Sequence, residues 1–202
     1  MIVVVGLSHK NAPIAVRELV ALSEPDISAF LQELVADVAV GEALIVSTCN
    51  RVELVAAGRG GASDLEAVAH ACEKALVARA PGIARHLYRH QGPAAVRHLF
   101  RVAASLDSLV VGEPQILGQV KDAYERAREA RTVGSVLHRT LSRAIRTAKR
   151  VRSETSIGSG QVSVPSVAVD LARRMFSDLS GHQALLVGSG EMAESVARLL
   201  AA

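Results

Sequence analysis

This chain has few aromatic residues: its 202 residues include two tyrosines, three phenylalanines and no tryptophan. Half of the residues are apolar, so alanine, valine and leucine must build the core. The two cysteines do not have the close spacing of a paired motif such as C-x-x-C, which argues against a disulfide framework and against a metal site. No stretch approaches the roughly 18 uncharged apolar residues of a membrane span, and the N-terminus lacks the basic region of a signal peptide. We therefore expect one or two domains in the cytoplasm, with reduced thiols.

Acidic residues are unevenly distributed along the chain. Residues 1–70 hold four Lys or Arg against nine Asp or Glu, a net charge of −5, and residues 71–202 hold nineteen against eleven, a net charge of +8. No acidic residue interrupts the predicted helix over 136–153. A polyanion is therefore expected to dock on the second region, although a solvated basic face is the alternative. The basic residues of this helix are Arg139, Arg143, Arg146, Lys149, Arg150 and Arg152.

The apolar pattern predicts an α+β fold in which strand, helix, strand, strand, helix and strand follow in ferredoxin-like order. A helical region comes next, and then a Ser- and Gly-rich linker over 155–163. The expected strands are residues 2–7, 43–47, 52–57, 86–90 and 183–187. The expected helices are 17–21, 23–38, 63–79, 93–105, 114–131, 136–154 and 164–178, with a last one from Gly190. Capping is expected from Ser8 or Asn11 for the first helix, and from Ser23 and Ser63 for the next two.

Cys49 follows the apolar run 43–46 and lies two residues before Arg51. The run predicts a short buried strand, and the polar residues after it a loop at the strand's end. A thiol near a guanidinium has surroundings that favour the nucleophilic thiolate, although an inert, half-buried cysteine is the alternative. Cys72 falls on the apolar stripe of a predicted helix and should face a core.

Two further positions point to chemistry. His98 should point away from the apolar stripe Val96, Leu99, Phe100, Ala103 and Leu106, so it is expected either in solvent or in a site, where it could act as a general base or acid. Near the end of the chain, a glycine-rich segment follows a predicted strand and opens a helix, as in the G-x-G-x-x-G/A dinucleotide fingerprint. Its residues are Gly188, Ser189, Gly190, Glu191, Met192 and Ala193.

Four segments in the same order resemble the glutamyl-tRNA reductase family. The first three are residues 6–13, residues 47–53 and residues 96–103, and the fourth, 106–121, continues the third. They read Gly-Leu-Ser-His-Lys-Asn-Ala-Pro, Ser-Thr-Cys-Asn-Arg-Val-Glu, Val-Arg-His-Leu-Phe-Arg-Val-Ala and Leu-Asp-Ser-Leu-Val-Val-Gly-Glu-Pro-Gln-Ile-Leu-Gly-Gln-Val-Lys. Because proteins of this family are about twice as long, the chain is expected to be an N-terminal part of such an enzyme.

The resemblance implies a function and a division of the chain. Residues 1–155 would form a catalytic domain, ferredoxin-like over 1–91 and helical over 92–155, and residues 156–202 the linker and the beginning of a Rossmann-type domain. The implied reaction is the NADPH-dependent reduction of glutamyl-tRNA(Glu) to glutamate-1-semialdehyde through a Cys49 thioester, the first step of five-carbon tetrapyrrole synthesis. A homodimer, and hand-over of the product to glutamate-1-semialdehyde aminomutase, are implied as well.

The family's site residues are carried over by position. Cys49 and His98 would be catalytic, residues 188–193 would bind NADPH, and no metal is implied. Arg51 is our choice for the γ-carboxylate of the substrate, because a guanidinium can bind a carboxylate through two parallel hydrogen bonds. The residues expected to bind the glutamyl substrate are Thr48, Cys49, Asn50, Arg51, Ser108, Glu113, Pro114, Gln115 and Gln119.

Two other classes of function compete with this one. A non-catalytic RNA-binding module with a vestigial thiol would show no difference in reactivity between Cys49 and Cys72. A Cys-dependent oxidoreductase acting on a small aldehyde or acyl thioester would not depend on charged tRNA.

Overall fold

The structure is a computed structural model that describes residues 1–59, 64–158, 163–176 and 178–201. Four antiparallel strands form one sheet in the order β2-β3-β1-β4. The strands are β1 (Ile2–Ser8), β2 (Val40–Ser47), β3 (Arg51–Gly58) and β4 (Tyr88–Gln91). With α1 (Ile14–Glu18), α2 (Glu24–Ala36) and α3 (Leu65–Arg79) between them, these strands follow the order expected from the sequence.

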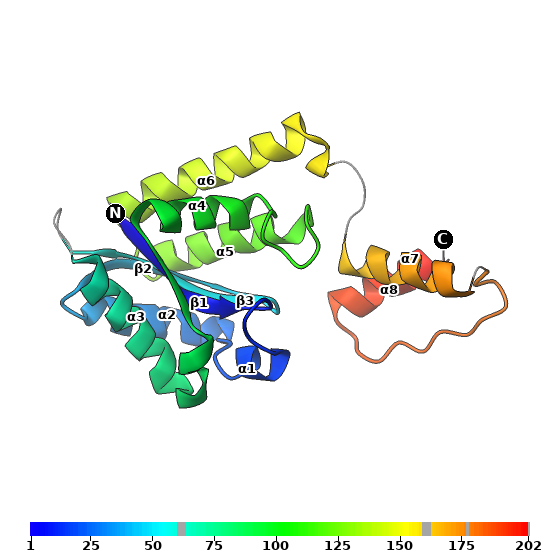
Figure 1. Ribbon diagram of the computed structural model, residues 1–202, viewed down its shortest axis with the longest axis horizontal. Helices are drawn as coiled ribbons and strands as arrows, with labels where there is room; N and C mark the ends of the chain where they lie inside the picture. Colours follow the sequence, from blue (N-terminus) through cyan, green and yellow to red (C-terminus); the bar gives the residue numbers. More distant parts are fainter. Residues whose placement is uncertain (60–63, 159–162, 177, 202) are drawn as a thin grey trace.

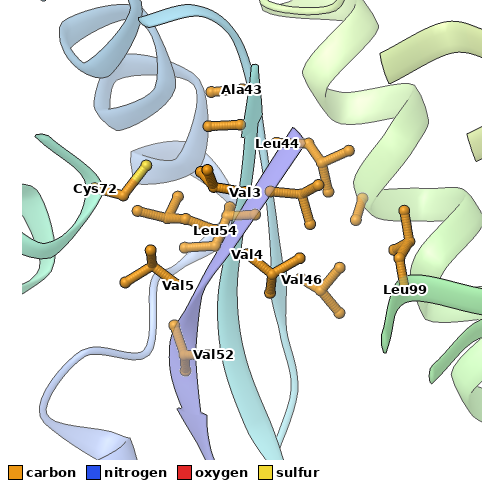
Figure 2. Packing of buried hydrophobic residues seen from close by; sticks show 14 of the residues in the cluster. Val3, Val4, Val5, Ala43, Leu44, Val46, Val52, Leu54, Cys72 and Leu99 are labelled. Carbon is orange, nitrogen blue, oxygen red and sulfur yellow. The ribbon is translucent and has the colours of Figure 1, made fainter. Parts of the chain in front are cut away.

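Helices cover both faces of the sheet (Figure 1). Helices α2 and α3 lie on one face, and α4 (Gly92–Ala103), α5 (Gln115–Glu129) and α6 (Ser135–Glu154) lie on the other. Every residue of β1 is therefore buried, which explains why the strand is a continuous apolar run rather than an alternating one. Figure 2 shows Cys72 of α3 on one side of the strands and Leu99 of α4 on the other, with Val4 and Val46 on the side of Leu99.

Several local expectations need correction. The strand expected over 86–90 begins at Tyr88, because a 3-10 helix occupies Pro81–His86. Helix α1 begins after Pro13, and the Asn11 side chain accepts a hydrogen bond from the Ser8 backbone N–H instead of capping the helix.

The two predicted capping boxes also differ from expectation. Ser23 is the N-cap of α2, but its hydroxyl bonds the Asp26 carboxylate and caps no backbone N–H. Ser63 lies outside the described residues, and the Asp64 side chain caps α3 by accepting from the Glu66 N–H.

The strand expected at 183–187 does not form. Helix α7 (Val164–Phe176) and helix α8 (Glu191–Ala201) pack together, but residues 183–187 between them are exposed and, within the described chain, pair with no strand. A lone extended segment has no ladder of hydrogen bonds to hold it, so an apolar run is not sufficient to make a strand. Within the described residues no helix is long and apolar enough to cross a bilayer.

Candidate active site around Cys49

The loop between β2 and β3 presents Cys49 to solvent. The Thr48 backbone N–H donates to the Arg51 carbonyl at 2.8 Å, and the Thr48 hydroxyl accepts from the N–H groups of Asn50 and Arg51 at 3.2 and 3.1 Å. Arg17 of α1 also holds this loop, because its Nε donates to the Cys49 carbonyl at 2.9 Å. No local pattern indicates this role of Arg17, because it depends on how α1 folds back on the loop.

A cavity of about 170 Å³ adjoins the thiol. It brings together residues from the Cys49 loop, from the loop that follows α4, and from the start of α5. Every residue expected to bind the glutamyl substrate lines this cavity except Pro114, which is the exposed N-cap of α5. The lining residues are Thr48, Cys49, Asn50, Arg51, Ser108, Glu113, Gln115, Ile116 and Gln119, with Val164 of α7 and Met192 of α8.

Internal contacts hold the loop between α4 and α5, which places Ser108 in the cavity wall. The buried Ser105 has φ of 61°, and its hydroxyl donates to the Glu113 carbonyl at 2.6 Å. Gly112 has φ of +91°, and a Cβ there would lie 2.6 Å from the Ile157 carbonyl oxygen, so only glycine fits. The Ser108 hydroxyl is buried without a hydrogen-bond partner among the described residues. Such an atom in a cavity wall is suited to a polar ligand.

Arg51 is buried in an ion-pair network rather than exposed beside Cys49. Its side chain is 1% exposed, Nη1 donates to Glu53 at 2.9 Å, and Nη2 donates to the Asp107 carbonyl oxygen. Lys10 bonds the Asp107 carboxylate from the surface. Each terminal nitrogen therefore has a partner and keeps a second N–H group, and the assignment of Arg51 to the γ-carboxylate stays a prediction.

Cys49 and His98, the two residues that the family resemblance makes catalytic, were expected to lie on one cleft, but His98 does not line the Cys49 cavity. The buried residues of α4 are Gly92, Ala95, Leu99, Val102 and Ala103, whereas Val96 and Leu106 of the predicted stripe are more than one-third exposed. The true apolar face is thus turned relative to the predicted one, and His98 points to the sheet, where Nε2 lies 2.7 Å from the Glu53 carboxylate.

The Glu53 carboxylate contacts both His98 and Arg51, and Gly6 on the neighbouring strand leaves space for its side chain. Gly6 on β1 pairs with both Glu53 and Tyr88, and a Cβ at Gly6 would lie 2.9 Å from the Glu53 side chain. The Tyr88 hydroxyl reaches across to bond the same carboxylate. An acidic residue within the apolar strand 52–57 is a signal that sequence reasoning could have used, since a buried carboxylate needs partners.

The protonation states follow from this network. Burial raises the pKa of Glu53, but the hydrogen bond with His98, the charge of Arg51 and the Tyr88 hydroxyl outweigh it and leave the pKa lowered. Burial and the charge of Arg51 lower the pKa of His9, whose Nδ1 is buried without a partner among the described residues. Burial raises the pKa of the Cys72 thiol to about 12, so that cysteine is the inert core residue expected.

The basic face of α6 is partly committed to internal contacts. Arg150 pairs with Glu154, and Arg152 is half-buried and donates to the Glu113 carbonyl at 3.2 Å. The other four basic side chains are exposed and make no ion pair among the described residues. These are Arg139, Arg143, Arg146 and Lys149.

The glycine-rich segment lies at the start of α8 without the strand that the fingerprint requires. Gly188 has φ of +125°, and no atom lies within 4 Å of a Cβ built at Gly188 or Gly190. The backbone is therefore open to a phosphate group, as dinucleotide binding needs. Met192 of the same segment reaches the Cys49 cavity.

Comparisons with known proteins agree on one family. Residues 5–155 match the family described as "Glutamyl-tRNAGlu reductase, N-terminal domain". The chain is 52% identical over 214 residues to the glutamyl-tRNA reductase of Sorangium cellulosum, with 97% of this chain and 40% of that protein covered. It is 50% identical over 197 residues to that of Geobacter sulfurreducens, with 98% and 45% covered.

A solved structure gives the same result. Glutamyl-tRNA reductase from Methanopyrus kandleri is similar with a TM-score of 0.67 and 36% identity, and the likeness covers 99% of this chain and 46% of that one. The chain thus spans less than half the length of these relatives. From the match over 5–155 and these identities, we conclude that the chain belongs to the glutamyl-tRNA reductase family.

Proposed function

We propose that this chain is the part of a glutamyl-tRNA reductase that takes glutamate from tRNA(Glu) and holds it as a thioester on Cys49. One observation carries the proposal: an exposed thiol adjoins a polar cavity of about 170 Å³ whose wall holds the unpartnered Ser108 hydroxyl. In the whole enzyme the product is glutamate-1-semialdehyde, made in the first step of five-carbon tetrapyrrole synthesis.

The thioester forms by acyl transfer. The Cys49 sulfur attacks the ester carbonyl, a carbon–sulfur bond forms, and the bond from that carbon to the ribose oxygen breaks. The thiol proton ends on the departing ribose hydroxyl, so the step needs no oxidant or reductant. Division of one difficult reduction into acyl transfer and reduction is the advantage of covalent catalysis.

The cavity supplies polar contacts for the glutamyl group. Ser108, Gln115 and Gln119 offer a hydroxyl and two amides, and Glu113 offers an acceptor for the α-ammonium group. Arg51 forms part of the wall, and its guanidinium attracts the γ-carboxylate by charge while Glu53 and Asp107 fix its position. The remaining two cavity residues of the Cys49 loop, Thr48 and Asn50, keep the thiol at the tip of its turn.

His98 acts at a distance in this proposal. It bonds Glu53, which bonds Arg51, so His98 is a positioning residue for the guanidinium at the cavity rather than a base that touches the thiol. A change at His98 should therefore alter binding of the glutamyl group more than the reactivity of the thiol.

The glycine-rich segment fits a dinucleotide phosphate in one respect, because the space above Gly188 and Gly190 is open and helix α8 begins directly after them. Residues 188–193 would hold NADPH, and Met192 connects that segment with the Cys49 cavity. When bound, NADPH supplies the hydride that converts the thioester to the aldehyde.

Two further parts of the proposal rest on the family resemblance alone. They are a homodimer of the whole protein and hand-over of the semialdehyde to glutamate-1-semialdehyde aminomutase. A cytoplasmic setting that keeps Cys49 reduced is part of the proposal as well, and it comes from the sequence pattern.

The test is incubation of the chain with tRNA(Glu) that carries labelled glutamate, with and without NADPH. The label should become bound to the protein through a thioester, be lost in Cys49→Ser, and persist in Cys72→Ser. Because no strand precedes the glycine-rich segment in the described structure, we expect glutamate from hydrolysis and no semialdehyde. Absence of protein-bound label in the wild type would contradict the acyl-transfer role, and label from a small glutamyl ester but not from glutamyl-tRNA would favour a small-molecule oxidoreductase.

A further inference from the structure

A second hollow lies on α4, distinct from the Cys49 cavity. It has a volume of about 460 Å³ and is lined by nitrogen-bearing side chains and two residues of the first turn of the helix. The His90 and His98 rings stack within it, with centroids 4.5 Å apart and planes inclined by 29°. The lining residues are His90, Pro93, Ala94, Arg97, His98 and Arg101.

Two guanidiniums dominate the charge of this hollow, and that of Arg101 donates a long hydrogen bond to the Leu106 carbonyl at 3.4 Å. Arg97 and Arg101 are one helical turn apart and exposed, and neither forms an ion pair within the described part of the chain. Helix α4 contains no acidic residue. Like charges at this spacing destabilise a helix by a few tenths of a kcal/mol, so the pair is better suited to an external anion than to stabilising the fold.

An apolar hollow of about 590 Å³ shares a wall with the cationic one. It lies between α4 and α6, and Pro93, Arg97 and Arg101 line both hollows. The side chain of Phe100 contributes an aromatic ring to its lining. The apolar lining residues include Met1, Val96, Phe100, Leu106 and Val151.

The cationic hollow joins the apolar one along α4, and the apolar hollow and the Cys49 cavity meet at the loop that follows α4. Leu106 lines the apolar hollow and Ser108 lines the Cys49 cavity, so the distance between the two sites along the chain is two residues. A ligand that fills all three must carry an anionic group, an apolar planar group and an acyl group in that order. A single-stranded nucleotide end that bears an ester has this chemistry, because bases leave the stack to lie on apolar and aromatic side chains while arginines hold the backbone.

We propose that α4 binds the single-stranded 3′ end of the RNA substrate, with a phosphodiester between Arg97 and Arg101 and an unstacked base in the apolar hollow beside Phe100. The terminal nucleotide then passes over Leu106–Ser108 and brings its ester to Cys49. The identity of the RNA as glutamyl-tRNA rests on the function proposed above, but the binding surface does not.

The experiment measures binding of uncharged tRNA to the chain by fluorescence anisotropy over a series of salt concentrations. The double variant Arg97→Gln/Arg101→Gln should bind at least about tenfold more weakly at low salt, and its slope of log K against log salt should fall by about one to two. The matched control is Lys74→Gln/Arg79→Gln, which removes the same charge from α3 on the opposite face of the sheet. Equal losses in both double variants, or no loss in the α4 variant, would overturn the proposal.

A second measurement tests the single-stranded end and the nature of the partner. A single-stranded oligonucleotide should compete better than a duplex of the same length, and an abasic oligonucleotide with the same phosphates should compete less well. Competition by polyglutamate equal to that of the single strand at matched ionic strength would point to an acidic protein and overturn the RNA assignment.

Failure of this inference can be told apart from failure of the proposed function. Cys49 should alkylate at the wild-type rate in Arg97→Gln/Arg101→Gln, because neither arginine lines the thiol's cavity. A wild type that binds tRNA through α4 but never acquires a glutamyl thioester would contradict the proposed function and leave the α4 surface supported. Thioester formation in the wild type, together with unchanged tRNA affinity in Arg97→Gln/Arg101→Gln, would support the proposed function and overturn the α4 surface.

Discussion

Residues 1–155 and residues 164–201 differ in how their apolar side chains are used. In the first region, Leu54 and Val52 are fully buried between helices on two faces of a sheet. In the second, Leu185 and Val187 are 89% and 91% exposed, although they occupy the same kind of apolar run. An apolar run therefore becomes a strand only where neighbouring strands supply its hydrogen bonds and helices cover its faces.

The largest effect that this comparison predicts is in hydrogen exchange. Amides of β1 and β3 should exchange at least about 10³-fold more slowly than those of residues 183–187, because the strands open only with the global fold. The measurement is native-state exchange followed by mass spectrometry of peptides. Comparable protection in the two segments would show that 183–187 is paired in solution.

The buried ion pair sets the next largest effect. Glu53→Ala should lower the free energy of unfolding by about 3–5 kcal/mol, since Arg51 would remain buried without its nearer carboxylate partner and keep only the Asp107 carboxylate at 3.6 Å. Glu73→Ala, which breaks the exposed pair with Arg89, is the control and should cost no more than about 1 kcal/mol. Denaturant titration measures both, and similar costs for the two variants would mean that Arg51 is solvated.

Core deletions compare the two regions directly. Leu54→Ala should cost about 2–5 kcal/mol because it leaves a cavity in the sheet's core, whereas Leu185→Ala should stay within about 0.5 kcal/mol. Thermal or denaturant unfolding gives both values. A large loss of unfolding free energy in Leu185→Ala would mean that Leu185 is buried in a core. The two regions would then use their apolar residues in the same way.

The smallest effect is the dependence of the Glu53 contribution on pH. The folded pKa of Glu53 lies below the ordinary value of 4.5, so its stabilisation is present above that value and is lost as pH falls through the folded pKa. The stability difference between the wild type and Glu53→Gln should therefore be constant near neutral pH and shrink below about pH 4.5. A difference that grows on acidification would reverse the assigned direction.

Much of the fold could be predicted from local signals. The four strands of the sheet and its covering helices follow from apolar runs and helical stripes, which depend on neighbours in the sequence. The residues that line the cavity were predicted where several of them lie in one segment, as in the loop at Cys49 and the turn into α5. The buried ion pairs of Arg51 were not predicted because its partner Asp107 comes from a distant loop, and the contact of His98 with Glu53 was not predicted because the buried face of α4 is turned relative to the expected stripe. Contacts of this kind depend on tertiary packing that no local pattern contains.

The proposed function requires that Cys49 is the reactive thiol and Cys72 a core residue. The most direct measurement is the rate at which iodoacetamide alkylates each cysteine in the native chain near neutral pH, followed by peptide mass spectrometry. Because Cys49 is exposed and burial raises the pKa of Cys72 to about 12, Cys49 should be fully alkylated before Cys72 is detectably modified. Prior incubation with glutamyl-tRNA should protect Cys49. Equal alkylation rates for the two thiols in the folded protein, or no protection by glutamyl-tRNA, would contradict the claim.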